Sequence, residues 1–415
     1  ATAIFSTASG GDNNRAEGAY STISGGFVNA TYGDYASILG GVNNFVYGDG
    51  GVSAGGTLDG RLNNVFDDFG VISGGNANQA GSDDGSTQDT TNATYATISG
   101  GYKNVAAASY TNIGGGSNNY IYGEFGTIAG GGGTTSPVDG IPADTDGNVI
   151  ENDWGTIGGG QNNAIGVGFV EGNYATIGGG QSNSVYGNWG TIAGGRDNKS
   201  GDAYGTVAGG RNNWSYGAYG TVAGGRDNEA FGDYSFVAGR NAQLSFNADN
   251  SFLWNDGSYT GTFNSPNRFN VVSSEGMHFY TNGSLTTGVQ IFANGTGWNA
   301  VSDETLKTNL EAVDTQEVLD NLMTMPVSEW QFTDDPAGTR YIGPMAQDFH
   351  AAFGLGEDDT SINSVNMDGV TVAAIQGLYE QNQALQAQNT RQQIWRMLLS
   401  IFIVASSVMR WLKNN

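Results

Sequence analysis

A serine and a lysine, a potential nucleophile and a potential base, stand five residues apart at Ser302 and Lys307. A serine hydroxyl becomes a nucleophile when a neighbouring base takes its proton, and a lysine can be that base if desolvation lowers its pKa toward neutrality. Five residues is an awkward separation on one regular helix, so we expect the pair to span a strand or loop end and a helix start. In a second interpretation, Ser302 and Asp303 only cap a helix that begins near Glu304.

No other part of the chain suggests a comparable catalytic group. His278 and His350 are too few and too scattered to suggest a triad, and a lone histidine is usually structural. Acidic residues are spread through the loops, so a carboxylate pair for glycoside hydrolysis cannot be placed from the sequence.

The composition excludes several classes of protein. The 415 residues include 69 Gly, 6 Pro and no Cys, which excludes a disulfide scaffold and indicates repeated tight turns. With 15 Lys plus Arg against 40 Asp plus Glu, the formal net charge is -25, and no basic stripe is visible. Such a chain repels phosphate backbones, so we expect no nucleic-acid partner.

The elements before Ser302 are dominated by an internal repeat. An aliphatic-x-Gly-Gly core recurs in fourteen units, eight of whose thirteen spacings are 15 residues. An aromatic residue stands three positions before the aliphatic site in thirteen units, and an asparagine stands six positions after it in eleven. The aliphatic sites are Ala8, Ile23, Ile38, Val52, Ile72, Ile98, Ile113, Ile128, Ile157, Ile177, Ile192, Val207, Val222 and Val237.

A 15-residue period is too short for a helical repeat and predicts one coil of a β-solenoid, with two short strands and with Gly and Asn in the positive-φ turns. Stacked coils would align asparagine on asparagine and aromatic on aromatic, in a stack of roughly 65 to 70 Å at about 4.8 Å per coil. Each coil offers only one or two inward apolar side chains. We therefore expect a homotrimer or other parallel oligomer, with the aromatic or aliphatic column facing the neighbouring chains.

These units resemble the head repeats of trimeric autotransporter adhesins and related haemagglutinins, most clearly at Tyr204–Gly210 and Tyr219–Gly225. The resemblance covers about residues 1–256. It implies a left-handed parallel β-roll that binds a surface glycan or protein receptor.

Insertions lengthen the period at four places, and one of them suggests a metal site. Its oxygen-bearing residues could hold Ca²⁺ around a Gly turn, and the alternative is a solvated acidic loop. We expect no other cofactor. The candidate ligands are Asp144, Asp146, Asn148 and Asp153.

The remainder of the chain divides into four segments. Residues 257–301 predict a neck of short strands with Asn-Gly turns, and residues 302–374 have ordinary α+β patterning. Residues 375–393 space apolar and Asn residues by three and four, as in a short coiled coil. Residues 394–412 are strongly apolar and flanked by Trp and basic residues, which predicts a membrane-spanning helix or, alternatively, a buried trimeric bundle.

Three motifs in the α+β segment closely resemble the intramolecular chaperone of phage tailspikes, tail fibres and endosialidases, classed as peptidase S74 and also found in myelin regulatory factor. They are Ser302-Asp303 with Leu306-Lys307, then residues 341–348, then Asp368-Gly369-Val370 leading into residues 373–378. The resemblance covers about residues 301–393. It implies that three copies assemble the fibre and that the chain is then cut between Val301 and Ser302, with Ser302 as nucleophile and Lys307 as base or proton donor.

The sequence as a whole predicts a mainly β protein: a trimeric left-handed β-solenoid followed by a small α+β chaperone, a short coiled coil and an apolar helix. We expect a homotrimeric fibre or adhesin at a cell surface or on a virion, whose precursor is anchored in a membrane until self-cleavage frees it. The alternatives are a fibre that does not cleave and a glycan-degrading tailspike.

Overall fold

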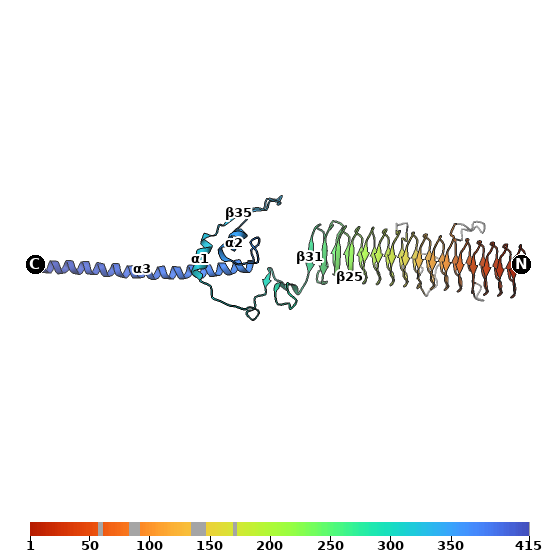
Figure 1. Ribbon diagram of the computed structural model, residues 1–415, viewed down its shortest axis with the longest axis horizontal. Coiled ribbons are helices and arrows are strands. Elements are labelled where there is room, and N and C mark those ends of the chain that lie inside the picture. The colour runs from red at the N-terminus through yellow and green to blue at the C-terminus, as the bar shows by residue number, and fades with distance from the viewer. Residues whose placement is uncertain (57–60, 83–91, 134–146, 169–171, 415) are drawn as a thin grey trace. The chain divides into compact units, whose positions relative to one another are not determined.

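The computed structural model describes residues 1–56, 61–82, 92–133, 147–168 and 172–414. The chain forms two units, Ala1–Glu275 and Gly276–Asn415. The first unit is a β-solenoid and the second is a small mixed unit that ends in a long helix (Figure 1).

The solenoid is built from two parallel sheets, to which each coil contributes one strand apiece. The first sheet has 16 strands: β1 Thr7–Ala8, β3 Thr22–Ile23, β5 Ser37–Ile38, β7 Val52–Ser53, β9 Val71–Ile72, β11 Thr97–Ile98, β13 Asn112–Ile113, β15 Thr127–Ile128, β17 Thr156–Ile157, β19 Thr176–Ile177, β21 Thr191–Ile192, β23 Thr206–Val207, β25 Thr221–Arg226, β27 Phe236–Arg240, β29 Phe252–Asn255 and β31 Phe269–Val272. The second has 15 strands: β2 Arg15–Ala16, β4 Ala30–Thr31, β6 Asn44–Val46, β8 Asn63–Val65, β10 Gln79–Ala80, β12 Val105–Ala106, β14 Tyr120–Ile121, β16 Val149–Ile150, β18 Ala164–Ile165, β20 Ser184–Val185, β22 Lys199–Ser200, β24 Trp214–Ser215, β26 Glu229–Ala230, β28 Gln243–Leu244 and β30 Thr262–Phe263.

The sheets confirm the predicted solenoid and extend it. The strands β29, β30 and β31 add to the fourteen repeats, and β30 and β31 lie in the range assigned to the neck. The ladder keeps equivalent residues paired across the insertions, since Thr127 of β15 pairs with Thr156 of β17. The left-handed winding and the trimer stay predictions.

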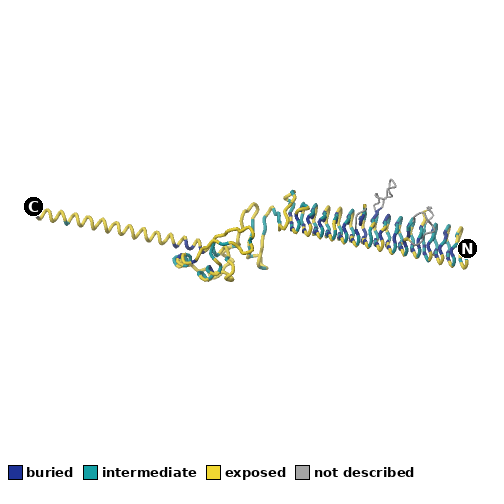
Figure 2. The backbone as a smooth tube through the Cα atoms, turned by 90° about the horizontal axis from the view of Figure 1, so that it is seen from above, coloured by how far each residue is buried: buried dark blue, intermediate teal, exposed yellow. Residues whose placement is uncertain are grey.

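The aliphatic column fills the interior of the solenoid, and its Ile and Val residues from Ile23 to Val237 are 0% exposed, apart from Val52 (Figure 2). The prediction was wrong at Val52, because the chain is one residue out of phase there and Ser53 takes the buried position between Ile38 and Ile72.

A second inward column comes from the other sheet, for example Val185 opposite Ile192. Each coil from Ile23 to Val237 therefore buries two inward residues, of which one or two are apolar, as predicted; the polar ones are Thr31, Ser53, Ser200 and Ser215. We expected either the aromatic or the aliphatic column to face neighbouring chains. Only the aromatic column is exposed, so the aliphatic column cannot make such a contact.

An asparagine ladder runs through the solenoid beside this core. In a typical coil, Nδ2 of Asn213 donates to the carbonyls of Gly209 and Gly225, at 2.8 and 3.0 Å, and the Asn213 backbone N–H donates to Oδ1 of Asn198. Oδ1 of Asn213 in turn accepts from the backbone and side chain of Asn228. Each amide thus ties its own coil to both neighbouring coils.

The aromatic column is a continuous stack of ten rings, with centroids 4.7 to 5.4 Å apart. The predicted positive-φ turns form at Gly and at residues such as Asn212, but these aromatic residues also have φ between 54° and 62°. Left-handed backbone is costly for a bulky residue, and stacking is the favourable contact available here to offset it. The stack comprises Phe69, Tyr95, Tyr110, Phe125, Trp154, Tyr174, Trp189, Tyr204, Tyr219 and Tyr234.

The second unit begins with an antiparallel sheet of β32 (Gly276–Tyr280), β33 (Gly288–Phe292) and β34 (Asn299–Ala300). A one-turn 3₁₀ helix η2 (Glu304–Leu306) follows, then α1 (Thr315–Thr324), the hairpin β35 (Ser328–Trp330) and β36 (Tyr341–Gly343), and α2 (Ala346–Phe353). The core is small: Met325, Phe349 and Val370 are its buried centre.

The last element, α3 (Ser364–Asn414), is one helix of 51 residues. It runs without interruption through the end of the predicted chaperone, the coiled-coil segment and the apolar segment. It is long and apolar enough to cross a membrane, with a mean hydropathy of 1.4 over its best window, none of which is buried (Figure 2).

Candidate functional site

Ser302 lies in the short connection between β34 and η2, at the edge of the three-stranded sheet. The preceding residue is held in place, because the backbone N–H of Val301 donates to the carbonyl of Gly288, at the start of β33, over 3.1 Å. This contact fixes the chain on the amino side of the Val301–Ser302 bond. Sequence reasoning missed Gly288, because a carbonyl contact leaves no signature in residue type.

Asp303 shapes the carboxyl side of the same bond. Its Oδ1 accepts hydrogen bonds from the backbone N–H and the hydroxyl of Thr305, both at 2.8 Å, and so caps η2. These bonds, together with the nearby Lys307 ammonium, lower the pKa of Asp303. The predicted cap is therefore present, and Asp303 rather than Ser302 forms it.

Lys307 directly follows η2 and returns to extended backbone, at φ -114° and ψ 149°. Its Nζ donates to Oγ of Ser302 over 2.7 Å and is 3.4 Å from the Ser302 carbonyl oxygen. The two predicted residues are thus brought together. Ser302 lies in the loop before η2, as expected, but Lys307 lies directly after this helix and not at its start. One chain is enough to form the contact, and both side chains are exposed in it.

An open cavity of ≈ 690 Å³ adjoins the amino side of the bond. Its lining includes Ala300 of β34 and the two residues that flank this strand, Trp298 and Val301. On the other side it includes Glu357, from the segment before α3, and Asp368 of α3. The first turns of α3 and the residue before Ser302 therefore share one cavity within the second unit.

The second sequence motif, residues 341–348, forms β36 and the start of α2. Tyr341 stacks on Trp330 of β35 with ring centroids 4.8 Å apart, and α2 places Phe349 in the core at 2% exposure. The helix ends at Gly354, whose φ of 63° is left-handed. This motif therefore forms the hairpin strand and the helix start that carry the adjoining Phe349 into the core.

The third motif lies on α3, where Gly377 packs against α1. A Cβ at this position would lie 2.3 Å from the carbonyl oxygen of Thr315, so only glycine allows the approach. The contact is completed by Gln316, whose Nε2 donates to the Gly377 carbonyl over 2.7 Å. By contrast, a Cβ at Gly369 would meet nothing within 4 Å.

The two histidines have local partners. Nδ1 of His278 lies 3.0 Å from the Tyr280 hydroxyl, and Nδ1 of His350 lies 3.1 Å from the carbonyl of Leu355. These contacts fit the structural role expected from the sequence.

Two of the predicted calcium ligands, Asp144 and Asp146, lie outside the described residues. Asn148 is a fully buried member of the asparagine ladder, where Nδ2 donates to Gly160 and Oδ1 accepts from Asn163. Oδ1 of Asp153 accepts from the backbone of Glu124 over 2.8 Å. In the part of the chain that the structure describes, no group of three or more His, Cys, Asp or Glu side chains could hold a metal. Calcium binding stays a prediction.

Residues 302–354 match the family model of the chaperone of endosialidase, peptidase S74. The match begins at Ser302 itself and ends at Gly354, the C-cap of α2, so it contains the first two motifs and leaves the third outside. No curated protein matches the chain. The chain therefore combines a β-solenoid of about sixteen turns with a chaperone-of-endosialidase domain.

Proposed function

We propose that this chain is the protomer of a homotrimeric surface fibre, whose C-terminal unit drives assembly and then cuts the chain between Val301 and Ser302. The solenoid is the fibre and would carry any receptor-binding surface. The observation that supports cleavage most directly is the 2.7 Å contact between Lys307 Nζ and Ser302 Oγ, at the first residue of the family match.

The chemistry follows from the position of Ser302 on its own scissile bond. Oγ of Ser302 attacks the carbonyl carbon of Val301 while the neutral Lys307 amine accepts the hydroxyl proton. The C–N bond then breaks, the Ser302 nitrogen takes the proton, and Val301 is left as an ester on Oγ. Water hydrolyses the ester to a Val301 carboxylate and a free Ser302 hydroxyl, and the new Ser302 α-amine takes the proton that is released, so atoms and charge balance.

Assembly would supply what a single chain lacks. A lysine in water carries a proton at neutral pH and becomes a base when it is desolvated. Ser302 and Lys307 are exposed in one chain, so the packing of three copies around them would switch the dyad on. Cleavage would then follow trimer formation and not precede it.

The exposed face of α3 supports association. The side chains of Ile375, Leu378 and Leu385 are 61%, 48% and 53% exposed, at spacings of three and seven residues. Apolar residues at such spacing pack against equivalent residues of other helices, and Asn382 and Asn389 continue the pattern as polar positions that would fix the register. A parallel three-helix coiled coil over residues 375–393 is the arrangement we propose.

The apolar end of the same helix would anchor the precursor in a membrane. Residues 394–412 are exposed along the helix, with Trp395 and Trp411 at the two edges beside Arg396 and Arg410. Tryptophan and basic side chains favour the membrane interface. Self-cleavage after Val301 would leave this anchor behind with the chaperone.

The test is to express the full chain beside its Ser302→Ala and Lys307→Ala variants. Wild type should give two fragments on a denaturing gel, with masses set by a cut after Val301 and a downstream fragment that begins at Ser302. Both variants should remain at full length. If the assembled wild type also remains uncut, the self-cleaving function is wrong.

The exposure of both dyad side chains favours one second candidate, a fibre whose chaperone seeds trimers and stays attached. Intact mass of the purified trimer separates the two, because only the first function removes residues 302–415.

A further inference from the structure

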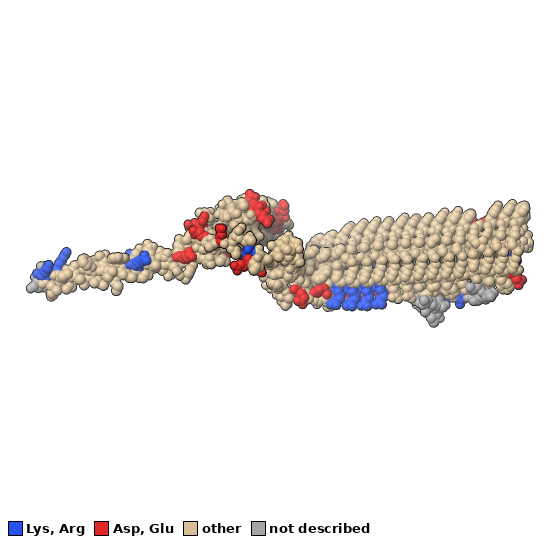
Figure 3. Space-filling model, turned by 60° about the horizontal axis from the view of Figure 1, so that its bottom comes forward, with Lys and Arg blue, Asp and Glu red and all other residues tan. Residues whose placement is uncertain are grey.

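Four arginines on successive coils form one continuous strip on the solenoid, which we call the arginine column (Figure 3). Parallel bridges join Arg196 to Arg211 and Arg211 to Arg226, and the pairing of β25 with β27 joins Arg226 to Arg240. All four side chains are exposed. At about 4.8 Å per coil, the column spans roughly 14 Å along the solenoid axis.

The column overturns the expectation that the chain has no basic stripe. The arginines are 14 or 15 residues apart in the sequence, so they look isolated there, and the coil brings them together. They are four of only 15 basic residues in a chain of net charge -25.

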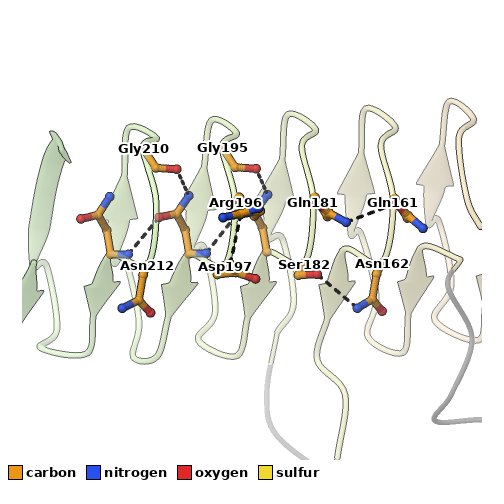
Figure 4. A network of polar contacts seen from close by, with 12 residues as sticks. Gln161, Asn162, Gln181, Ser182, Gly195, Arg196, Asp197, Gly210 and Asn212 are labelled. Atoms are coloured by element: carbon orange, nitrogen blue, oxygen red, sulfur yellow. Dashed lines mark hydrogen bonds and ion pairs between the residues drawn. The ribbon is translucent and has the colours of Figure 1, made fainter. Parts of the chain in front are cut away.

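The fold does not require arginine at this position. In preceding coils the same column holds Gln161 and Gln181, whose side-chain amides hydrogen bond to each other at 3.3 Å (Figure 4). Further along, it holds Phe27, Val42 and Tyr102. A run of stacked like charges disfavours the folded solenoid, so a structural role does not explain it.

Only part of this charge is neutralised within the chain. Nε of Arg196 lies 3.3 Å from Oδ2 of Asp197, and Nε of Arg226 lies 3.0 Å from Oδ2 of Asp227. In the alternate coils Asn212 and Asn241 occupy the position of these aspartates. Across the described residues, Arg211 and Arg240 have no carboxylate within 4.0 Å, which leaves the column with a net positive charge.

A flat, open shelf runs beside the column, because a Gly-Gly pair precedes the arginine in three of the coils. A Cβ added at Gly224 would meet nothing within 4 Å, and one at Gly209 would meet only the Gly194 carbonyl, at 3.8 Å. An extended ligand can therefore lie along the axis within reach of every guanidinium.

We propose that the arginine column binds a linear acidic polysaccharide laid along the solenoid axis. Guanidinium groups pair bidentately with carboxylate and sulfate, and a polymer with about one charge per sugar residue repeats on the scale of one coil. At physiological salt, charges beyond about 8 Å are screened, so the column acts despite the acidity of the rest of the chain. This inference depends on neither cleavage nor membrane anchoring.

The surroundings favour a polysaccharide over a single-stranded nucleic acid. Nucleic-acid channels add aromatic side chains on which bases stack. Here the residues directly before and after the arginines are Gly on one side and Asp or Asn on the other. The ring faces of the ten-ring aromatic stack are covered by their neighbours, so they offer no stacking platform either.

The test uses the full-length chain in a neutral detergent, titrated with galacturonic acid oligomers in a calorimeter, with dextran as the uncharged polymer and oligothymidylate as the nucleic-acid probe. The key variant is the double substitution Arg211→Gln/Arg226→Gln. It gives these two positions glutamine, the residue that Gln181 already places in the same column of a preceding coil. Its matched control, Arg15→Gln/Arg268→Gln, removes the same charge elsewhere.

The column variant should bind galacturonate about tenfold more weakly, and the control within about twofold of wild type. The reverse change, Gln181→Arg, extends the column by one coil and should tighten binding. No binding of galacturonate, or an equal loss in both double variants, would overturn the proposal. Tighter binding of oligothymidylate that depends on the column would also overturn it, because the column would then be a nucleic-acid site. A change in oligomeric state of the column variant alone would do the same, because the column would then be a contact between copies.

Discussion

Nζ of Lys307 donates to Oγ of Ser302 over 2.7 Å, and the single turn of η2 between them closes this distance. Asp303 stabilises this turn by accepting a hydrogen bond from the backbone N–H of Thr305. The hydrogen bond from Val301 to the Gly288 carbonyl fixes the chain before Ser302. The nucleophile, its partner and the bond it would attack are therefore positioned by two local contacts and by one contact to the neighbouring strand.

Replacing Lys307 with arginine separates a chemical role from a positional one. Arginine keeps the positive charge and can still donate to Ser302, but it does not lose its proton in proteins. We expect Lys307→Arg to assemble and to remain uncut, as Ser302→Ala does, when full-length and cleaved chains are compared on a denaturing gel. The control Lys413→Arg should cleave normally. Cleavage by Lys307→Arg at the wild-type rate would exclude lysine as the base.

The two glycines of the third motif should respond oppositely to alanine. A Cβ at Gly377 clashes with the Thr315 carbonyl, so Gly377→Ala should destabilise the packing of α1 on α3 by about 1 to 3 kcal/mol. Gly369→Ala adds a methyl group in open space and should stabilise the helix by up to about 1 kcal/mol. Denaturant unfolding of the two variants measures the difference, and equal effects would contradict the close approach.

The asparagine ladder should be intolerant of truncation. Asn213 is fully buried, and Asn213→Ala removes the donor for two part-buried glycine carbonyls and the buried acceptor for Asn228, which should cost about 2 to 4 kcal/mol in the free energy of unfolding. The neighbouring Asn212 is exposed, and Ser182 occupies the same position with the same φ of 55°. Asn212→Ser should therefore change stability by less than about 1 kcal/mol. Thermal unfolding of both variants tests the contrast.

Asp256 should make the end of the solenoid sensitive to acid. Hydrogen bonds from Ser258 and Ser274 lower the pKa of its carboxyl well below the ordinary value of 3.8. A lowered pKa in the folded state means that the carboxylate contributes fully above pH 3.8, and that this contribution is lost as the pH falls below it. The difference in melting temperature between wild type and Asp256→Asn should stay constant from pH 7 to about 4 and shrink in stronger acid. A constant difference down to pH 2 would exclude this linkage.

The sequence period predicted the solenoid because an aliphatic residue such as Val207 and an asparagine such as Asn213 recur at the same place in successive coils. The aliphatic residue suits the buried interior, and the asparagine suits the hydrogen-bonded ladder. It did not predict the left-handed backbone at Tyr204, since aromatic residues avoid that region without a stack to hold them. The coil around Phe269 was assigned to the neck, because its spacing departs from 15 residues.

The candidate site was predictable in part. The spacing of Ser302 and Lys307 indicated a dyad, but the supporting carbonyl of Gly288 depends on tertiary contact alone. The arginine column was missed for a related reason. Arg211 and Arg226 belong to a run that is confined to a few coils, so they are no part of the pattern that all coils share.

Because the strand pairing keeps a constant register, the solenoid could contain more or fewer coils without changing how they pack. Thr206 pairs with Thr221 just as Thr191 pairs with Thr206, so every coil meets its neighbours through the same surfaces. Stability in such an array is close to a sum of one contribution per unit and one per junction. Deleting residues 204–218 would therefore remove one whole coil and bring two equivalent coil surfaces into contact. Duplication or loss of one 15-residue period in the gene would lengthen or shorten the solenoid by one coil and leave its two ends unchanged.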